Sequence, residues 1–252
     1  MVNDLNFNLV LSGGGARGYA HIGILQALQE QGLEINAISA TSAGALIGVL
    51  ICDGYSPAQI KEIILNEEPK ISWSALGIKQ GLFSSHTIQG ILKKYLRSKT
   101  FEELKTPLFI SLTNLASGEC EIINNGPLLE VLLASSAIPA IFSPVLINNV
   151  PYADGGMTNN LPSEPFQNSK VKTIACHVNP LSPYQSNFST AKIIDRSMHI
   201  VLRNTIKKSI QNAYLFIEPP NLHQFHLLDT KKAKEIIDMA YKYVKENVNL
   251  LV

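Results

Sequence analysis

This sequence has few charged residues, few aromatic residues and almost no net charge. Charged residues make up 16% of the 252 positions and aromatic residues 7%, and the formal net charge is +1. A protein that binds nucleic acid normally carries a clear excess of Lys and Arg on one face. The near-neutral balance therefore argues against nucleic acid as a partner.

Cysteine is also scarce. Cys52, Cys120 and Cys176 are the three cysteines, and they are widely spaced within apolar runs. This spacing suggests neither the disulfide framework of a small secreted domain nor a Cys-x-x-Cys metal pair. We therefore expect the protein to reside in a reducing compartment.

The amino terminus lacks both a basic region and a long apolar run. The apolar run at residues 7–11 is far too short for a signal-peptide core or a membrane span. We expect a soluble, cytoplasmic protein. The chain length and an apolar content of 46% suffice for one large core, so we expect a single domain over residues 1–252.

Hydrophobic patterns predict an α/β fold. Residues 7–12 and 35–40 resemble short buried strands, and each is followed by a helical pattern, at 19–31 and 43–52. Successive strand–helix units are typical of a parallel sheet. Two hairpins, around residues 116–118 and 148–149, predict an antiparallel part of the sheet. We expect further helices at 56–66, 85–96, 128–137, 191–210 and 230–244, and further strands at 107–115, 119–123, 145–147, 150–152, 172–178 and 213–217.

A glycine run follows the first predicted strand. Gly13, Gly15 and Gly18 fit the Gly-x-Gly-x-x-Gly pattern, which also occurs in dinucleotide-binding turns. A dinucleotide site needs an acidic residue at the end of the second strand, but residues 40–42 are Ala-Thr-Ser. The alternative of a nucleotide-binding oxidoreductase therefore lacks its main support. Two interpretations of the glycine run remain, a simple tight turn and an oxyanion hole. Three adjacent glycines favour the oxyanion hole, because they let backbone N–H groups approach an anion without obstruction by side chains.

The second strand-to-helix turn carries a serine. Residues 40–44 read Ala-Thr-Ser-Ala-Gly, which is Gly-x-Ser-x-Gly with alanine in place of the first glycine. Small flanking residues permit the strained turn that exposes a nucleophilic serine, and the following helix amino terminus favours negative charge. Serine is also a common helix N-cap. We interpret Ser42 as the nucleophile because a glycine-rich loop and a candidate base accompany it.

Asp154 is the candidate base. It follows a predicted strand and precedes Gly155 and Gly156, which could fix its carboxylate toward Ser42, although an Asp-Gly pair is also a common turn. The histidines have simpler interpretations, because they fall in predicted helices, in a strand or in a late loop. They are His21, His86, His177, His199, His223 and His226.

Together these motifs resemble those of the patatin-like phospholipase family, whose members carry a glycine-rich oxyanion loop, a Gly-x-Ser-x-Gly serine and an Asp-Gly-Gly or Asp-Gly-Ala aspartate. The corresponding segments here are residues 13–18, 40–44 and 154–156, in the same order and with similar separations. Residues 134–144 and 159–162 resemble the family's segments before and after the aspartate. The resemblance covers residues 9–178.

The resemblance implies a three-layer α/β/α fold with a mainly parallel central sheet. It implies that Ser42 and Asp154 form a Ser-Asp dyad that hydrolyses lipid acyl esters without a metal or a cofactor. The substrate would be a phospholipid, a lysophospholipid or another acyl ester. The implied oxyanion-hole residues are Gly13, Gly14, Gly15, Arg17 and Gly18, and the implied nucleophile elbow includes Ala40 and Gly44.

Two residues of these motifs leave alternatives open. Arg17 either fixes the glycine loop through a hydrogen bond, which we favour, or contacts a lipid phosphate. Ala40 departs from the family pattern and bears on the rate more than on the identity of the nucleophile. It also supports an alternative function, a catalytically weak relative that binds lipids or a protein.

Two further segments predict contact with lipid. Residues 73–83 combine glycines with apolar side chains, so we expect either a mobile cover over the acyl-chain site or ordinary core. The predicted helix 191–210 is strongly basic, which indicates either transient contact with an anionic membrane surface or a solvated face. Its basic residues are Lys192, Arg196, Arg203, Lys207 and Lys208.

Overall fold

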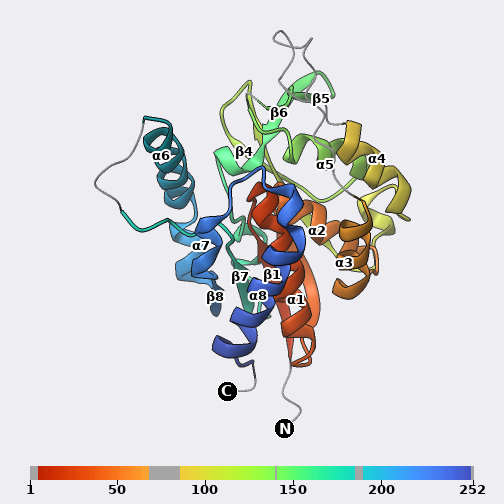
Figure 1. Cartoon of the computed structure of the whole chain (residues 1–252). Helices are drawn as coiled ribbons and strands as arrows, with labels where there is room; N and C mark the ends of the chain where they lie inside the picture. The colour runs from red at the N-terminus through yellow and green to blue at the C-terminus, as the bar shows by residue number, and fades with distance from the viewer. Residues whose placement is uncertain (1–4, 68–85, 140, 185–189, 251–252) are drawn as a thin grey trace.

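The computed structural model describes residues 5–67, 86–139, 141–184 and 190–250 (Figure 1). The expected cover at residues 73–83 lies outside this part of the chain. The strands are β1 (Asn6–Leu11), β2 (Glu34–Ala40), β3 (Leu108–Asn114), β4 (Cys120–Ile123), β5 (Val145–Ile147), β6 (Val150–Asp154), β7 (Thr173–Cys176) and β8 (Leu215–Ile217). The α-helices are α1 (Ala20–Gln29), α2 (Ala43–Cys52), α3 (Pro57–Asn66), α4 (His86–Tyr95), α5 (Leu128–Ser135), α6 (Thr190–Thr205), α7 (Lys207–Asn212) and α8 (Ala233–Asn247).

The described strands form one mixed sheet in the order β5-β6-β3-β2-β1-β7-β8, with β4 also paired to β3. The pairs β3–β2, β2–β1, β1–β7 and β7–β8 are parallel. The pairs β3–β4, β3–β6 and β5–β6 are antiparallel. The predicted parallel sheet with an antiparallel part is therefore confirmed.

Both faces of the sheet are covered, as the alternation of side chains along β1 shows. Leu9 and Leu11 belong to a large core shared with α1, α2, α5 and α8, whereas Val10 belongs to a smaller core on the other face. Phe166 and Ile206 cover that second face. Since successive strand residues point to opposite faces, this division shows helices packed on a central sheet from two sides (Figure 1). The predicted three-layer α/β/α fold is confirmed.

The prediction of one helix over residues 191–210 is wrong. Helix α6 ends at Thr205, and α7 begins at Lys207. The Thr205 hydroxyl donates a hydrogen bond to the Leu202 carbonyl (2.8 Å), a local bond that competes with helix continuation. Ile206 between the helices is fully buried in the second core, and this tertiary contact leaves no trace in a helical pattern.

The predicted basic face is not continuous either. Arg196 donates to the Ser182 carbonyl (2.7 Å), and Arg203 pairs with Glu218 (2.8 Å). Lys207 and Lys208 are exposed but lie on α7 rather than on α6. No helix in the described ranges is long and apolar enough to cross a membrane.

Candidate active site

Sheet register brings Ser42 and Asp154 to the same level. Ala40 at the end of β2 lies opposite Ile110 of β3, and Leu112, two residues further along β3, lies opposite Asp154 of β6. Ser42, two residues beyond Ala40, therefore leaves the sheet beside the end of β6. The strand pairing thus places the predicted nucleophile next to the predicted base.

Ser42 occupies a strained turn between β2 and α2. Its φ is 51° and its ψ is −124°, in a region that residues other than glycine rarely adopt. The residue stands at the N-cap position of α2, but its side chain makes no capping hydrogen bond to any described residue. Ser42 is only 4% exposed, and its N–H donates to the Ser135 hydroxyl (2.9 Å). The Ser42 hydroxyl is therefore available for a role other than capping.

The Ser42 side chain lies beside the Asp154 carboxylate, and its interaction with that group favours the ionised form. Oδ1 of Asp154 accepts the N–H of Gly156 (2.8 Å). Burial raises the pKa of Asp154 to about 6, because a charged carboxylate loses its hydration, while the contacts with the Ser42 side chain and the Gly156 N–H act in the opposite direction. A carboxylate with this pKa is ionised at neutral pH and still basic enough to accept a proton.

The glycine run forms a loop beside the serine. A Cβ on Gly13 would lie 3.0 Å from Cβ of Ser42, and one on Gly14 would lie 2.6 Å from the Val178 side chain. Gly15 has a positive φ of 53° and packs against the Leu227 carbonyl. Within the described residues, no acceptor is paired with the N–H groups of Gly14 and Gly15. Two unpaired N–H groups close to a serine can stabilise an oxyanion.

Arg17 fastens this loop to a distant segment. Its Nε donates to the Phe225 carbonyl (2.8 Å), and the neighbouring Ala16 N–H donates to the Leu227 carbonyl (2.8 Å). The Arg17 side chain is almost fully buried. This geometry matches the loop-fixing role that we favour for Arg17.

Gly18 and Gly44 allow the loop and the elbow to approach closely. A Cβ on Gly18 would lie 2.4 Å from Cβ of Ala43, and one on Gly44 would lie 2.5 Å from the Leu11 carbonyl oxygen. Ala40 is fully buried, and it is not among the described residues with positive φ. Alanine at position 40 therefore occupies no conformation that requires glycine.

The histidines have other contacts. Nε2 of buried His21 donates to the Ser12 carbonyl (2.8 Å), and burial lowers the pKa of this imidazole to about 4. Nδ1 of His177 pairs with Glu218 (2.7 Å), and Nδ1 of His223 contacts the Pro220 carbonyl. Among the described histidine side chains, none is hydrogen-bonded to Ser42.

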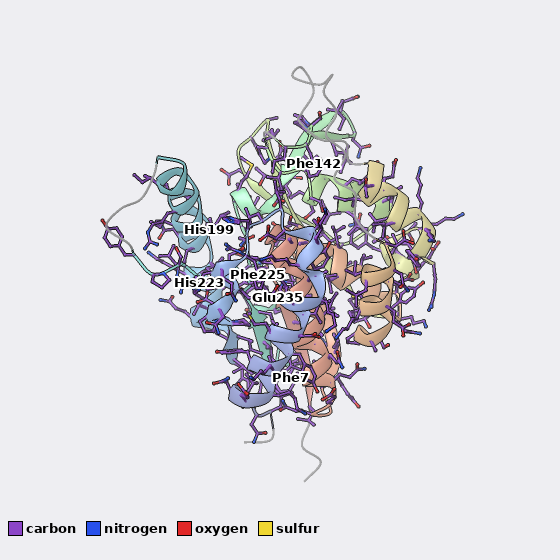
Figure 2. The ribbon with its side chains drawn as sticks, in the orientation of Figure 1. Phe7, Phe142, His199, His223, Phe225 and Glu235 are labelled. Carbon is purple, nitrogen blue, oxygen red and sulfur yellow. The ribbon has the colours of Figure 1, made fainter. Side chains whose placement is uncertain are left out.

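An apolar cavity of about 190 Å³ begins at Ser42. It extends along one face of α2, and Phe142, labelled in Figure 2, contributes from the segment between α5 and β5. None of the described residues that line it carries a charge. The apolar lining includes Leu46, Ile47, Leu50, Ile64, Ile88, Ile91, Leu92, Ile138, Leu227 and Leu228. Such a cavity fits a hydrocarbon chain attached to a group at Ser42.

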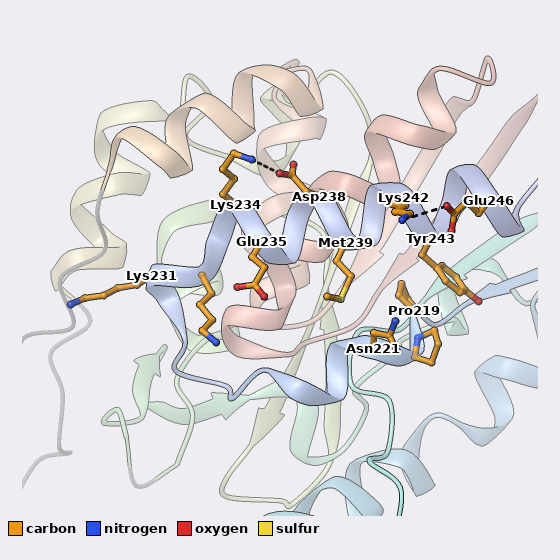
Figure 3. Close-up of a pocket in the computed structure, with 12 residues that line it drawn as sticks. Pro219, Asn221, Lys231, Lys234, Glu235, Asp238, Met239, Lys242, Tyr243 and Glu246 are labelled. Carbon is orange, nitrogen blue, oxygen red and sulfur yellow. Dashed lines mark hydrogen bonds and ion pairs between the residues drawn. The ribbon is translucent and has the colours of Figure 1, made fainter.

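A larger hollow of about 810 Å³ lies along α8 (Figure 3). Four lysines line it, but its acidic residues balance most of their charge, and Lys234–Asp238 (2.5 Å) and Lys242–Glu246 (3.8 Å) are paired. Neither Ser42 nor Asp154 contributes to its lining. Its size alone therefore does not make it a candidate catalytic site.

Two supporting residues escaped prediction from the sequence. Ser135 binds the Ser42 N–H, and Nδ2 of Asn179 donates to the Gly13 carbonyl (2.6 Å). Ser135 lies in the segment 134–144 that resembles the family pattern, which offered a signal of position but not of contact. Asn179 follows a predicted strand that pairs with β1, and only this pairing indicates its proximity to the glycine loop.

Known proteins are similar to this chain in sequence. A family model described as "Patatin-like phospholipase" matches residues 9–166. An uncharacterised NTE family protein of Mycobacterium tuberculosis is 32% identical over 180 residues, covering 68% of this chain and 48% of that protein. Lysophospholipase NTE1 of Kluyveromyces lactis is 26% identical over 269 residues, covering 93% of this chain and 18% of that protein. The chain thus spans less than half of the length of these relatives.

A solved structure shares the fold. VipD from Legionella pneumophila has a TM-score of 0.53 and 15% sequence identity, covering 95% of this chain and 66% of that chain.

Proposed function

This chain belongs to the patatin-like phospholipase family, and from that premise we propose that it hydrolyses lipid acyl esters with Ser42 and Asp154 as a catalytic dyad. The proximity of the Ser42 side chain to the Asp154 carboxylate, which the strand register sets, is the observation that carries this proposal. A serine hydroxyl becomes a good nucleophile when a positioned base accepts its proton.

The first half of the reaction forms an acyl-enzyme. Oγ of Ser42 attacks the ester carbonyl carbon while Asp154 accepts the hydroxyl proton. The N–H groups of Gly14 and Gly15 stabilise the negative oxygen of the tetrahedral intermediate. When this intermediate collapses, the alcohol leaves with the proton from Asp154, and the acyl group stays bound to Ser42.

The second half releases the acid. A water molecule attacks the acyl carbonyl carbon, and Asp154 accepts one of its protons. The new intermediate collapses, the proton returns to Oγ of Ser42, and the carboxylic acid leaves. Each proton that Asp154 accepts is therefore donated again, and the dyad is regenerated without a metal or a cofactor.

The substrate that we propose is a phospholipid, a lysophospholipid or another acyl ester. The uncharged, apolar cavity next to Ser42 supports an acyl chain. The name of the Kluyveromyces relative, a lysophospholipase, supports the lysophospholipid. The alternative, a catalytically weak lipid- or protein-binding relative, relied on Ala40, and the absence of a positive φ at that residue favours the catalytic proposal.

Three broader expectations stay predictions. We expect one domain, because the described strands join one sheet. We expect a reducing, cytoplasmic location, and all three cysteines are unpaired. We expect transient contact with a membrane surface. The basic helix that suggests this contact has fewer free cations than expected, because Arg196 and Arg203 bond to other parts of the chain.

Lipid product analysis tests the proposed function. Wild-type protein and Ser42→Ala are incubated with the same mixed lipid extract, and the released fatty acids and deacylated lipids are compared by mass spectrometry. We expect the wild type alone to release fatty acids. Equal release by both proteins would contradict the assignment of Ser42, and no release by either would contradict the proposed activity.

A further inference from the structure

Ser135 is the last residue of α5, and its hydroxyl contacts the main chain of the candidate nucleophile. Its Oγ accepts the N–H of Ser42 (2.9 Å) and donates to the Ser111 carbonyl (2.9 Å). Ser135 is completely buried, so water does not compete for either bond. A single side chain thus joins the main chain of Ser42 to β3.

The two bonds fix the direction of this hydroxyl. A serine hydroxyl has one hydrogen, and a carbonyl can only accept, so the hydrogen of Ser135 points to Ser111. Lone-pair density of the same oxygen then faces the N–H of Ser42. The Ser111 carbonyl is itself fixed, because Ser111 pairs with Ile122 of β4 within the sheet.

The same short segment also holds the base. The N–H of Asp154 donates to the carbonyl of Ala137 (3.0 Å), two residues after Ser135. Gly155 packs so closely on the Ser111 carbonyl that a Cβ there would lie 2.2 Å from its oxygen. Residues 135–137 and the Ser111 carbonyl are therefore a shared support for the main chains of Ser42 and Asp154.

We propose that Ser135 is a positioning residue for catalysis, whose hydroxyl holds the strained main chain of Ser42 so that Oγ stays directed at Asp154. A non-glycine residue at φ 51° persists only where its surroundings enforce that conformation. The N–H at this helix end has no partner within α2, and Ser135 supplies one. The inference rests on the proposed function, since it assigns a support to the same nucleophile.

A positioning role for Ser135 predicts a different result from a role in stability alone. If Ser135 only stabilised the fold, its loss would lower the unfolding temperature while the folded fraction kept its turnover number. If it orients Ser42, the folded variant binds substrate normally but reacts slowly. The ratio of effects on kcat and KM separates these cases.

The experiment compares Ser135→Ala, Ser135→Thr and Ser39→Ala with the wild type. Ser135→Thr retains the hydroxyl. Ser39 is a matched control because it is fully buried on β2 and its hydroxyl has no hydrogen-bond partner in the described chain. Three quantities are measured for each folded protein: kcat and KM for a p-nitrophenyl acyl ester, the rate of labelling by a fluorophosphonate, and the unfolding temperature.

We expect kcat of Ser135→Ala to fall about 10- to 100-fold, the cost of a misplaced reacting group, with KM within about twofold. Fluorophosphonate labelling should slow in parallel, because it reports the reactivity of Ser42 directly. Ser135→Thr should retain kcat within about threefold, and Ser39→Ala should match the wild type. A folded Ser135→Ala variant with wild-type kcat and labelling rate would overturn the inference.

A second measurement covers the case in which Ser135→Ala does not fold. Residue-resolved hydrogen exchange of the wild type should show a strongly protected Ser42 amide, and rapid exchange there would overturn the inference. A wild type that neither hydrolyses esters nor reacts with the fluorophosphonate would contradict the proposed function instead. The two failures are therefore distinguishable.

Discussion

The Asp154 carboxylate lies beside the side chain of Ser42, although Asp154 ends β6 in the antiparallel part of the sheet and Ser42 follows β2 in the parallel part. The pairing of Leu112 with Asp154 sets this contact, because it brings the end of β6 level with the turn after β2. A one-residue slip between β3 and β6 would turn the carboxylate to the opposite face of the sheet. The candidate chemistry therefore depends on strand register as much as on residue identity.

The activity should depend on pH through Asp154. Burial raises the pKa of this carboxyl to about 6, and only the ionised form can accept the proton of Ser42. We expect kcat/KM for an uncharged ester to rise with pH up to about 6.5 and then to level off. A pH–rate profile from pH 4.5 to 8 measures this limb, and a midpoint near pH 4 would show that the carboxylate is not desolvated in the free enzyme.

Asp154→Asn should stabilise the protein at neutral pH. A pKa of about 6 in place of the ordinary 3.8 corresponds to about 3 kcal/mol of unfavourable burial of the charge. Because the folded state binds the proton more tightly than the unfolded state, wild-type stability falls as pH rises from about 4 to about 6. The stabilisation by Asn should therefore be absent below pH 4 and complete above pH 6.5.

Urea unfolding of both proteins at pH 4 and pH 7 measures this difference. If the wild type and Asp154→Asn had equal unfolding free energies at pH 4 and also at pH 7, Asp154 would carry no desolvation cost. Activity provides the complementary readout, since the more stable Asn variant should be the less active one.

Gly44 should be essential for the packing of the elbow. A Cβ at this position would lie 2.5 Å from the Leu11 carbonyl oxygen and 2.6 Å from that of Ser12, and both are main-chain atoms that cannot move independently. We expect Gly44→Ala to lose about 2 kcal/mol of unfolding free energy and most of its turnover. Denaturant unfolding and ester turnover measure the two effects.

Gly90→Ala is the matched control for that substitution. Gly90 is also helical, but a Cβ there would meet no described heavy atom within 4 Å. Alanine should raise stability by up to about 1 kcal/mol through its helix propensity. If both variants behaved alike, the close approach of α2 to the end of β1 would not be real.

Leu50 should limit the length of the acyl chain. It lies eight residues after Ser42 on the face of α2 that lines the cavity, about 12 Å along the helix axis. Leu50→Ala should enlarge the far end of the cavity and shift the preference of kcat/KM toward longer p-nitrophenyl esters. A series of ester chain lengths measures the shift.

Leu25→Ala controls for the loss of a buried leucine. Leu25 is also buried, on α1, but does not line the cavity. Both variants should lose about 2–5 kcal/mol of stability, and only Leu50→Ala should change the chain-length profile. An identical profile in both variants would place the acyl chain elsewhere.

Local patterns in the sequence predicted most of the fold. The apolar runs of β1 and β2, the glycine run and the small residues around Ser42 each encode their conformation within a few neighbouring positions. Ser56 and Pro57 likewise mark the start of α3, where the structure shows a capping box with Gln59. These features could be predicted because short-range physical chemistry determines them.

Contacts between distant segments could not be predicted in this way. The break at Ile206 depends on burial in the second core, and the bond from Arg17 to the Phe225 carbonyl joins opposite ends of the chain. The bond from Ser42 to Ser135 likewise needs the packing of α5 on β3. The family resemblance indicated which segments matter, but not which atoms meet.

The most direct test of the Ser42–Asp154 dyad is the turnover of one p-nitrophenyl acyl ester by a set of folded variants. The set contains Ser42→Ala, Asp154→Asn and single substitutions of the six histidines. A positioned general base contributes about 10²- to 10⁴-fold to the rate, so Asp154→Asn should lose at least about 100-fold in kcat while it keeps its KM. Each folded histidine variant should stay within a few-fold of the wild type. The dyad would be contradicted if one histidine variant lost its turnover while Asp154→Asn retained wild-type kcat, since a Ser-His mechanism would then be required.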